Sequence, residues 1–259
     1  MFPYFQLFGR TIGSYGVCMV IGFLLVGWLA IRKCKKLSRP AEDIYIVGAC
    51  VLLAALVCGS LLYVFVTYPI SYIISAVSRG DFSFFGGIVF YGGLIGGIGG
   101  ALLGVRLARC PWNTLTQAIV PYVPLGHAIG RIGCLLAGCC HGMPYNGPLA
   151  VYYPNSVLQL PPDQGYFPVQ PLEALLNLGI CGCLIYLSKK ENGKKVLVPA
   201  YLCMYAVVRF TLEFFRGDEH RGIFSGVSLS QWISIGMLAV GVIWTVVTLK
   251  MNNHKKTKG

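Results

Sequence analysis

Charged side chains are scarce in this 259-residue sequence. Only 12% of the residues are Asp, Glu, Lys or Arg, whereas 56% are hydrophobic, and the mean hydropathy is +0.68. A soluble domain normally carries about 25% charged residues. The scarcity excludes an ordinary soluble fold and predicts that a lipid bilayer solvates most of the chain.

Several other features are missing as well. The first residues show no basic segment and no small-residue cleavage site, so we expect the first apolar stretch to be retained as a helix. Many of the 11 cysteines lie inside apolar runs, which argues against a disulfide framework. No soluble domain, low-complexity tract or internal repeat stands out. We therefore expect a single integral membrane domain over residues 1–259.

Seven apolar stretches are long enough to be membrane-spanning helices, each of which needs about 20 residues to cross a hydrocarbon core of about 30 Å. They cover residues 12–31, 44–66, 86–105, 115–137, 170–188, 197–215 and 228–249. The sequence therefore predicts an all-α polytopic membrane protein with about seven transmembrane helices.

Lysine and arginine collect on one side of these spans. That side holds Arg32, Lys33, Lys35, Lys36, Arg39, Arg106, Arg109, Lys189, Lys190, Lys194, Lys195, Lys250, Lys255, Lys256 and Lys258. The opposite side holds only Arg10, Arg79, Arg216 and Arg221. Positive charge favours the cytoplasmic side, so we expect the N-terminus outside and the C-terminus inside. The net charge of +12 is thus a topology signal that points to anionic membrane lipids as partners rather than to nucleic acid.

The stretch 138–169 is predicted to lie outside the cytoplasm and contains no Lys or Arg. It is rich in Pro, Gly and Tyr, and it is too apolar for a solvated linker. Aromatic residues favour the membrane interface. We therefore expect this loop to lie at the outer membrane surface.

Arg131 and Arg209 lie within apolar spans, near their outer ends. An arginine inside a span costs about 2.5–3.5 kcal/mol on insertion scales, so it usually has a partner or faces a polar cavity. Both could instead extend to the interface. Because guanidinium matches phosphate oxygens bidentately, we interpret the two residues as a clamp for a phosphate-bearing lipid.

Acidic residues stand close to this predicted clamp. Glu213 lies four residues after Arg209, so the two share a helix face, either as a plain ion pair or with Glu213 orienting the arginine. Glu173, beside Gln170, stands at the outer start of the fifth span.

Other candidate site residues also have a purely structural interpretation. Tyr15 could belong to an interfacial aromatic belt, and His127, one turn before Arg131, could be a base or a buried polar residue. The glycine pairs of residues 86–100 recur at helical spacing. Such a stripe indicates a close helix-packing face or a glycine-lined approach to a ligand.

Five segments, in order along the chain, resemble the prolipoprotein diacylglyceryl transferase family. They are SYG (14–16), YGGLIGG (91–97), GRIGCLLAGCCHG (130–142), FPVQPLEA (167–174) and RFTLEFFR (209–216). The seven-span topology with the N-terminus outside also fits that family.

The resemblance implies transfer of diacylglycerol from phosphatidylglycerol to the lipobox cysteine thiol in a prolipoprotein signal peptide, the first step of lipoprotein maturation. Glycerol phosphate would be the second product, with no cofactor or metal. It also implies the bacterial cytoplasmic membrane, with the site facing the outer leaflet. The implied catalytic residues are Tyr15, Tyr91, Arg131, Cys134, Arg209 and Glu213. The implied substrate-binding residues are Arg131, Arg209, Gly92, Gly93, Gly142, Gln170 and Glu173.

This chain departs from the family pattern at several polar positions. The family has histidine, asparagine and glutamate where this chain has Tyr91, Cys134 and Cys139. The differences point to a divergent branch. They leave open whether Tyr91, His127 or His141 acts as the base, and whether the acceptor is the usual one or the protein binds lipid without chemistry.

Cys134, Cys139 and Cys140 allow further interpretations. A thiol beside a clamped phospholipid could act as nucleophile and form a covalent lipid–enzyme intermediate. Together with His141 the three cysteines offer soft metal ligands, or two of them could form a disulfide. Adjacent cysteines are poor partners in a tetrahedral site, and the paired CxxC spacing of zinc sites is absent. We therefore expect no metal.

Overall fold

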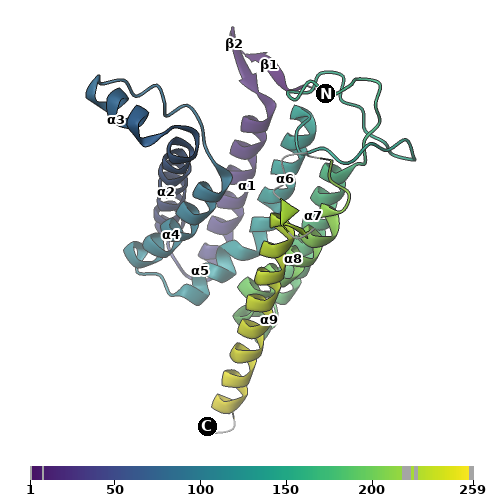
Figure 1. The fold of residues 1–259 in the computed structure, drawn as a ribbon. Coiled ribbons are helices and arrows are strands. Elements are labelled where there is room, and N and C mark those ends of the chain that lie inside the picture. The colour runs from purple at the N-terminus through teal and green to yellow at the C-terminus, as the bar shows by residue number, and fades with distance from the viewer. Residues whose placement is uncertain (1, 8, 218–222, 225–226, 257–259) are drawn as a thin grey trace. The chain divides into compact units, whose positions relative to one another are not determined.

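A computed structural model describes residues 2–7, 9–217, 223–224 and 227–256 (Figure 1). Arg221 and Lys258, used above for topology, lie outside these residues. The described chain is mainly helical, so the predicted all-α polytopic class is confirmed. The number of membrane crossings and the sides of the two termini stay predictions.

The order of elements follows the predicted spans closely. The helices are α1 (Ser14–Lys36), α2 (Glu42–Thr67), α3 (Ile70–Ser78), α4 (Phe90–Ala108), α5 (Trp112–Ile119), η1 (Val120–Tyr122), α6 (Val123–Ala137), α7 (Val169–Leu187), η2 (Gly193–Lys195), α8 (Leu197–Glu213) and α9 (Leu229–Lys256). The strands are β1 (Tyr4–Leu7), β2 (Arg10–Gly13), β3 (Ile223–Phe224) and β4 (Val227–Ser228), paired antiparallel as β1–β2 and β3–β4.

Six segments of the described chain are long and apolar enough to cross a membrane: α1, α2, α4 from Tyr91, the α5–η1–α6 segment, α7 and α9 to Met251. The seventh predicted span, α8, has 17 residues, the short end of the usual range. Large apolar side chains such as Leu53, Ile95 and Ile243 are exposed along these helices. A bilayer, but not water, would solvate such surfaces favourably.

Proline and glycine explain where the predicted boundaries were inexact. The predicted span 115–137 is broken by η1, because Pro121 and Pro124 have no backbone N–H to continue the helix. The helix in the predicted span 86–105 begins later, at Phe90, and Gly86 and Gly87 before it disfavour helical structure. The helix α3 and the strands were not predicted.

The chain divides into two compact units, residues 31–115 and residues 1–30 with 116–259. In the first, α4 packs on α2 through Gly92, Gly96, Gly100 and Gly104. A Cβ at Gly96 would lie 2.2 Å from the carbonyl oxygen of Ala54. The glycine stripe is therefore a packing face, one of the two predicted alternatives. The single-domain organisation stays a prediction.

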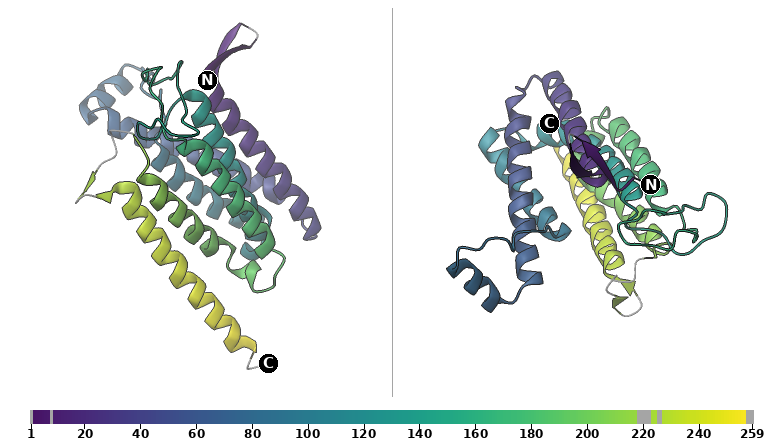
Figure 2. Two further views of the ribbon diagram at one scale, coloured as in Figure 1. Left: turned by 90° about the vertical axis from the view of Figure 1, so that its right-hand side faces the viewer. Right: turned by 90° about the horizontal axis from the view of Figure 1, so that it is seen from above.

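The second unit contains α6, α7, α8 and α9, with the first part of α1 against α6. A Cβ at Gly22 of α1 would lie 3.2 Å from the carbonyl oxygen of Gly126, and one at Gly133 would lie 2.9 Å from Cβ of Cys18. Leu184 of α7 and Leu197 of α8 form a buried cluster with Ile180. The long loop between α6 and α7 gathers at the end where α6 stops and α7 starts (Figure 2).

Candidate functional site

An ion pair joins α6 to α7 inside the second unit. The Nη2 atom of Arg131 lies 3.0 Å from Oε1 of Glu173, and Nε2 of His127 lies 3.6 Å from the same oxygen. Glu173 is completely buried, and the Arg131 side chain is 14% exposed. His127 and Arg131 are four residues apart, so they share one face of α6. Breaking such a buried pair is strongly destabilising because it leaves an uncompensated charge.

A second arginine pair lies on α8. The Nη2 atom of Arg209 is 2.7 Å from Oε2 of Glu213, so the expected pairing along one helix face is observed. The same Nη2 donates a hydrogen bond of 3.0 Å to Oγ of Ser230 on α9. Glu213 and Ser230 therefore fix the position of this guanidinium.

Tyr205 and His127 lie between the two arginine pairs. Their ring centroids are 4.9 Å apart, which brings α8 against α6. Tyr205 is close enough to interact electrostatically with Arg131, Arg209 and Glu173. His127 likewise interacts with both arginines. The two guanidinium groups thus share neighbours although each has its own carboxylate.

Each arginine also has one buried nitrogen with no acceptor among the described residues. Nε of Arg131 and Nη1 of Arg209 are buried and have no hydrogen-bond partner within the described part of the chain. A guanidinium has five N–H donors, so one carboxylate does not satisfy it. Burying a donor without a partner costs about 1–3 kcal/mol, so an acceptor oxygen from a ligand would stabilise either nitrogen. A phosphate group offers several acceptor oxygens at once.

The segment after α6 is fixed to the end of α8. The N–H of Met143 donates to the carbonyl oxygen of Phe215 at 2.8 Å, and that of Gly217 donates to His141 at 3.1 Å. Gly142 and Arg216 form an isolated bridge between these segments. A Cβ at Gly142 would lie 2.3 Å from the carbonyl oxygen of Phe167, so only glycine fits there. This packing explains why glycine occupies position 142, and the predicted role of Gly142 in substrate binding stays a prediction.

Gln170 connects α7 to the same loop. Its Nε2 donates to the carbonyl oxygen of Cys139 at 2.9 Å, and its Oε1 accepts a 2.8 Å hydrogen bond from the hydroxyl of Tyr153. Burial raises the pKa of Tyr153 to about 12, so this phenol stays protonated and donates. Both side-chain ends of Gln170 are used within the protein, which indicates a positioning role.

Three thiols gather at the end of α6. The sulfur atoms of Cys134, Cys139 and Cys140 all lie within 4.8 Å of one another. Tyr15 interacts electrostatically with all three cysteines and with Arg131, and it is 44% exposed. The predicted residues Tyr15, Arg131 and Cys134 are therefore neighbours.

Tyr91, Gly92 and Gly93 belong to the other unit, residues 31–115. A Cβ at Gly92 would lie 2.5 Å from the carbonyl oxygen of Cys58 on α2, so packing alone requires this glycine. Tyr91 stands at the start of α4 and is 40% exposed. The predicted catalytic role of Tyr91 and the predicted binding roles of both glycines stay predictions.

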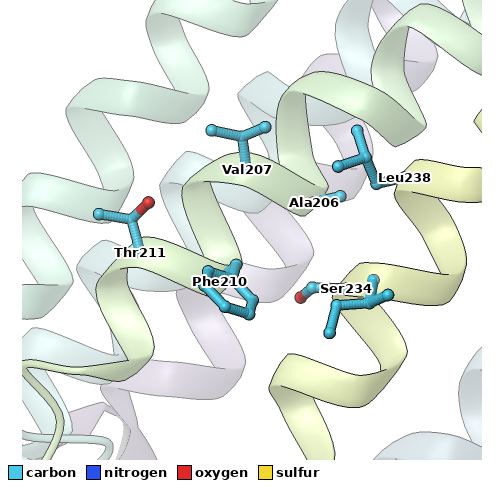
Figure 3. A pocket seen from close by; sticks show the side chains of 7 residues that line it. Ala206, Val207, Phe210, Thr211, Ser234 and Leu238 are labelled. Atoms are coloured by element: carbon cyan, nitrogen blue, oxygen red, sulfur yellow. The ribbon is translucent and has the colours of Figure 1, made fainter. Parts of the chain in front are cut away.

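An apolar pocket of about 200 Å³ lies between α8 and α9 (Figure 3). Phe210 of α8 and Ser234 of α9 face each other across it (Figure 3). Its lining residues are Ala206, Val207, Phe210, Thr211, Ser234, Ile235 and Leu238. Ser234 lies one helical turn after Ser230 on α9. The hydrogen bond between Arg209 and Ser230 therefore lies one turn away from the apolar pocket.

Sequence reasoning did not find Tyr205, Ser230 or Tyr153. Tyr205 lies four residues before Arg209 and eight before Glu213, a spacing that places all three on one helix face. This spacing could have identified Tyr205 from the sequence. Ser230 and Tyr153 contact the site only through the tertiary fold, and no local pattern marks them.

Comparison with known proteins identifies the family of the chain. The family model "Prolipoprotein diacylglyceryl transferase" matches residues 3–247. A phosphatidylglycerol–prolipoprotein diacylglyceryl transferase of Clostridium tetani is 30% identical over 92% of this chain and 94% of its own length. The corresponding protein 2 of Clostridium perfringens is 28% identical over 97% and 96%, and that of Methylibium petroleiphilum is 31% identical over 89% of each. The family expected from the five motifs is confirmed, and the chain belongs to the prolipoprotein diacylglyceryl transferase family.

Proposed function

We propose that this protein transfers the diacylglyceryl group of phosphatidylglycerol to the thiol of a lipobox cysteine in prolipoproteins and releases glycerol phosphate. Family membership and the names of the relatives support this reaction. The observation that carries it is the pair of guanidinium groups, Arg131 and Arg209, each with a buried and unsatisfied N–H.

The charges suit a phosphate leaving group. When the bond between the glycerol carbon and the phosphate oxygen breaks, negative charge grows on that oxygen. Preorganised donors in a site with little water stabilise such charge far more than they would in bulk solvent. Arg131 and Arg209 supply these donors, while Glu173, Glu213 and Ser230 hold them in place.

The pocket between α8 and α9 fits the apolar part of the same substrate. Its walls come mainly from apolar side chains such as Phe210 and Leu238, and Arg209 is hydrogen-bonded to Ser230, one turn from the pocket residue Ser234. A phospholipid has its phosphate next to its acyl chains. One acyl chain in the pocket would leave the phosphate near Arg209.

The charge distribution supports an orientation for the reaction. With the N-terminus outside and the C-terminus inside, loop 138–168 and the ends of α6 and α8 lie on the outer side. In this orientation the site faces the outer leaflet of the bacterial cytoplasmic membrane. An exported signal peptide would present its lipobox cysteine there.

The test is transfer by the purified full-length protein in detergent. A lipobox peptide is incubated with phosphatidylglycerol and analysed by mass spectrometry. We expect the peptide to gain the mass of one diacylglyceryl group and glycerol phosphate to accumulate in equal amount. A peptide with serine in place of the cysteine serves as the control and stays unmodified.

The same experiment separates the alternatives. A lipid mass increment on Cys134, Cys139 or Cys140 of the protein, without a peptide product, would favour a covalent intermediate with another acceptor. Unmodified peptide and unmodified protein, despite a folded and monodisperse sample, would refute the transferase proposal.

A further inference from the structure

The thiol cluster consists of Cys134, Cys139 and Cys140 at the end of α6. Its three sulfur atoms lie within 4.8 Å of one another. Sulfur atoms that bind one Zn²⁺ at about 2.3 Å in tetrahedral geometry are about 3.8 Å apart. The cluster would have to contract by only about 1 Å to hold such an ion.

The backbone explains how two adjacent cysteines reach the same centre. Helix α6 ends at Ala137. Gly138, the next residue, has a left-handed φ of 71°, and the N–H of Cys139 donates back to the carbonyl oxygen of Cys134. Cys140 is also left-handed, with φ 55°. This conformation costs about 1–2 kcal/mol for a residue with a Cβ. Two left-handed residues turn the chain back over the last turn of α6, and the three sulfurs meet there.

The surrounding charges fit a metal–thiolate centre. Three thiolates and one Zn²⁺ carry a single net negative charge. Arg131 lies one turn before Cys134 on α6, and Arg216 forms a backbone bridge with Gly142, two residues after Cys140. Positive neighbours would stabilise the centre although it contains a cation.

Among the residues that the structure describes, the cluster brings three close ligand atoms together. His141 follows it directly, but its Nδ1 lies 2.9 Å from the carbonyl oxygen of Gly142 and its ring packs against Tyr166. His141 does not belong to the group of close ligand atoms. Structural zinc sites are closed by four protein ligands, whereas catalytic ones have three and leave one position to water or substrate.

We propose that the thiol cluster binds one Zn²⁺ through three thiolates and that its fourth position binds the thiol of the acceptor cysteine. The second half of this inference rests on the proposed transferase function. A free thiol with a pKa of about 8.5 is mostly protonated at neutral pH, whereas a zinc-bound thiol is deprotonated. The ion would therefore perform the task of a general base in a chain that has Tyr91 where its family has histidine.

Transfer of the diacylglyceryl group to the acceptor thiol requires no oxidant. The acceptor thiol binds the zinc and loses its proton to water. The thiolate then attacks the glycerol carbon, a carbon–sulfur bond forms, and the carbon–oxygen bond to phosphate breaks. The electron pair of the broken bond leaves with glycerol phosphate, and the zinc keeps its charge throughout.

Metal binding is tested first on the full-length protein in detergent, purified under reducing conditions, stripped of metal and titrated with Co²⁺ or Zn²⁺. We expect one tightly bound ion and, with Co²⁺, thiolate-to-cobalt charge-transfer absorption. Cys140→Gly should lose this absorption and still fold, because glycine adopts the left-handed conformation without cost. Cys183→Ser, which changes an exposed cysteine of α7, is the matched control and should bind like the wild type.

Acceptor binding is tested on the Co²⁺-loaded protein without any lipid. A lipobox peptide should change the visible spectrum as a fourth thiolate replaces water, and the serine peptide should not. No stoichiometric metal, undiminished absorption in Cys140→Gly, or a disulfide within the cluster would overturn the zinc site. An unchanged spectrum with the cysteine peptide would overturn the acceptor role.

The readouts separate this inference from the transferase proposal. Metal and peptide binding are measured without phosphatidylglycerol, so their absence leaves the transferase proposal standing. Transfer that continues unchanged after metal removal overturns the catalytic role of zinc. A metal-loaded protein that binds the peptide and transfers no lipid overturns the transferase and leaves the metal site.

Discussion

The α2–α4 interface and the α6–α7–α8 region both use glycine, but they use charge differently. On α4, Gly92, Gly96, Gly100 and Gly104 let the backbone of α2 approach closely. On α6, glycines face α1 in the same way, while His127 and Arg131 face α7 and α8. Close packing alone therefore does not identify a site. Within the described residues, the buried guanidinium groups with unsatisfied donors mark the candidate site.

The largest expected effect is on stability, from Glu173→Gln. The change leaves Arg131 buried without its counter-charge, which costs about 3–5 kcal/mol for a broken buried pair. Thermal unfolding in detergent should show a large loss. Glu191→Gln removes a carboxylate that is 85% exposed and pairs with Lys194, so it should leave the unfolding temperature unchanged. Equal behaviour of the two variants would mean that the α6–α7 pair contributes no stability.

Arg131→Ala should nearly abolish transfer. Loss of one donor that stabilises the leaving group reduces kcat by about 10²–10³-fold in comparable sites. The rate of peptide modification, measured on monodisperse protein, gives the effect. Arg39→Ala removes an arginine from the other unit, where it pairs with Asp43, and should retain activity. Full activity of Arg131→Ala would refute the phosphate clamp.

Gly96→Ala tests the packing region. The added Cβ would lie 2.2 Å from the carbonyl oxygen of Ala54, and overpacking of this kind costs about 1–3 kcal/mol. Gly99→Ala is the matched control, because nothing lies within 4 Å of its Cβ position. The difference in unfolding temperature between the two variants measures the interface. If both variants are equally stable, α2 and α4 are not packed as described.

Arg209→Lys should have a smaller effect, of about tenfold in transfer rate or about 1.4 kcal/mol. Lysine keeps the charge and loses the planar fork that can contact Glu213, Ser230 and a phosphate at once. Arg39→Lys makes the same change in a pair with the same spacing, Arg39–Asp43, and should not alter the rate. Matching rates for the two variants would show that charge alone matters at position 209.

Local sequence signals predicted much of this molecule. Apolar length predicted helical structure at the seven stretches, with ends that differ by up to seven residues, and the spacing of Arg209 and Glu213 predicted their ion pair. Both follow from helical periodicity, which sequence shows directly. The short helix α3 and the strand pair β1–β2 are too small to give a comparable signal.

Contacts between segments that are distant in the sequence could not be predicted. Glu173 was expected at the site, but its pairing with Arg131 depends on how α7 packs on α6. Tyr153 reaches Gln170 only because the loop folds back over α7. Adjacent cysteines seemed poorly suited to meet at one centre, yet the left-handed backbone of Cys140 brings their sulfur atoms together. No sequence pattern predicts a left-handed conformation at this cysteine.

The hydrogen bonds of loop 138–168 have a consequence for proteolysis. Tyr145 bonds to Gly165, Val151 to Tyr166, and Met143 to Phe215, so both arms of the loop are attached on either side of residues 158–163. Most of those six residues are exposed. A protease that cuts there should produce two fragments that stay associated through backbone contacts and migrate together until they are denatured.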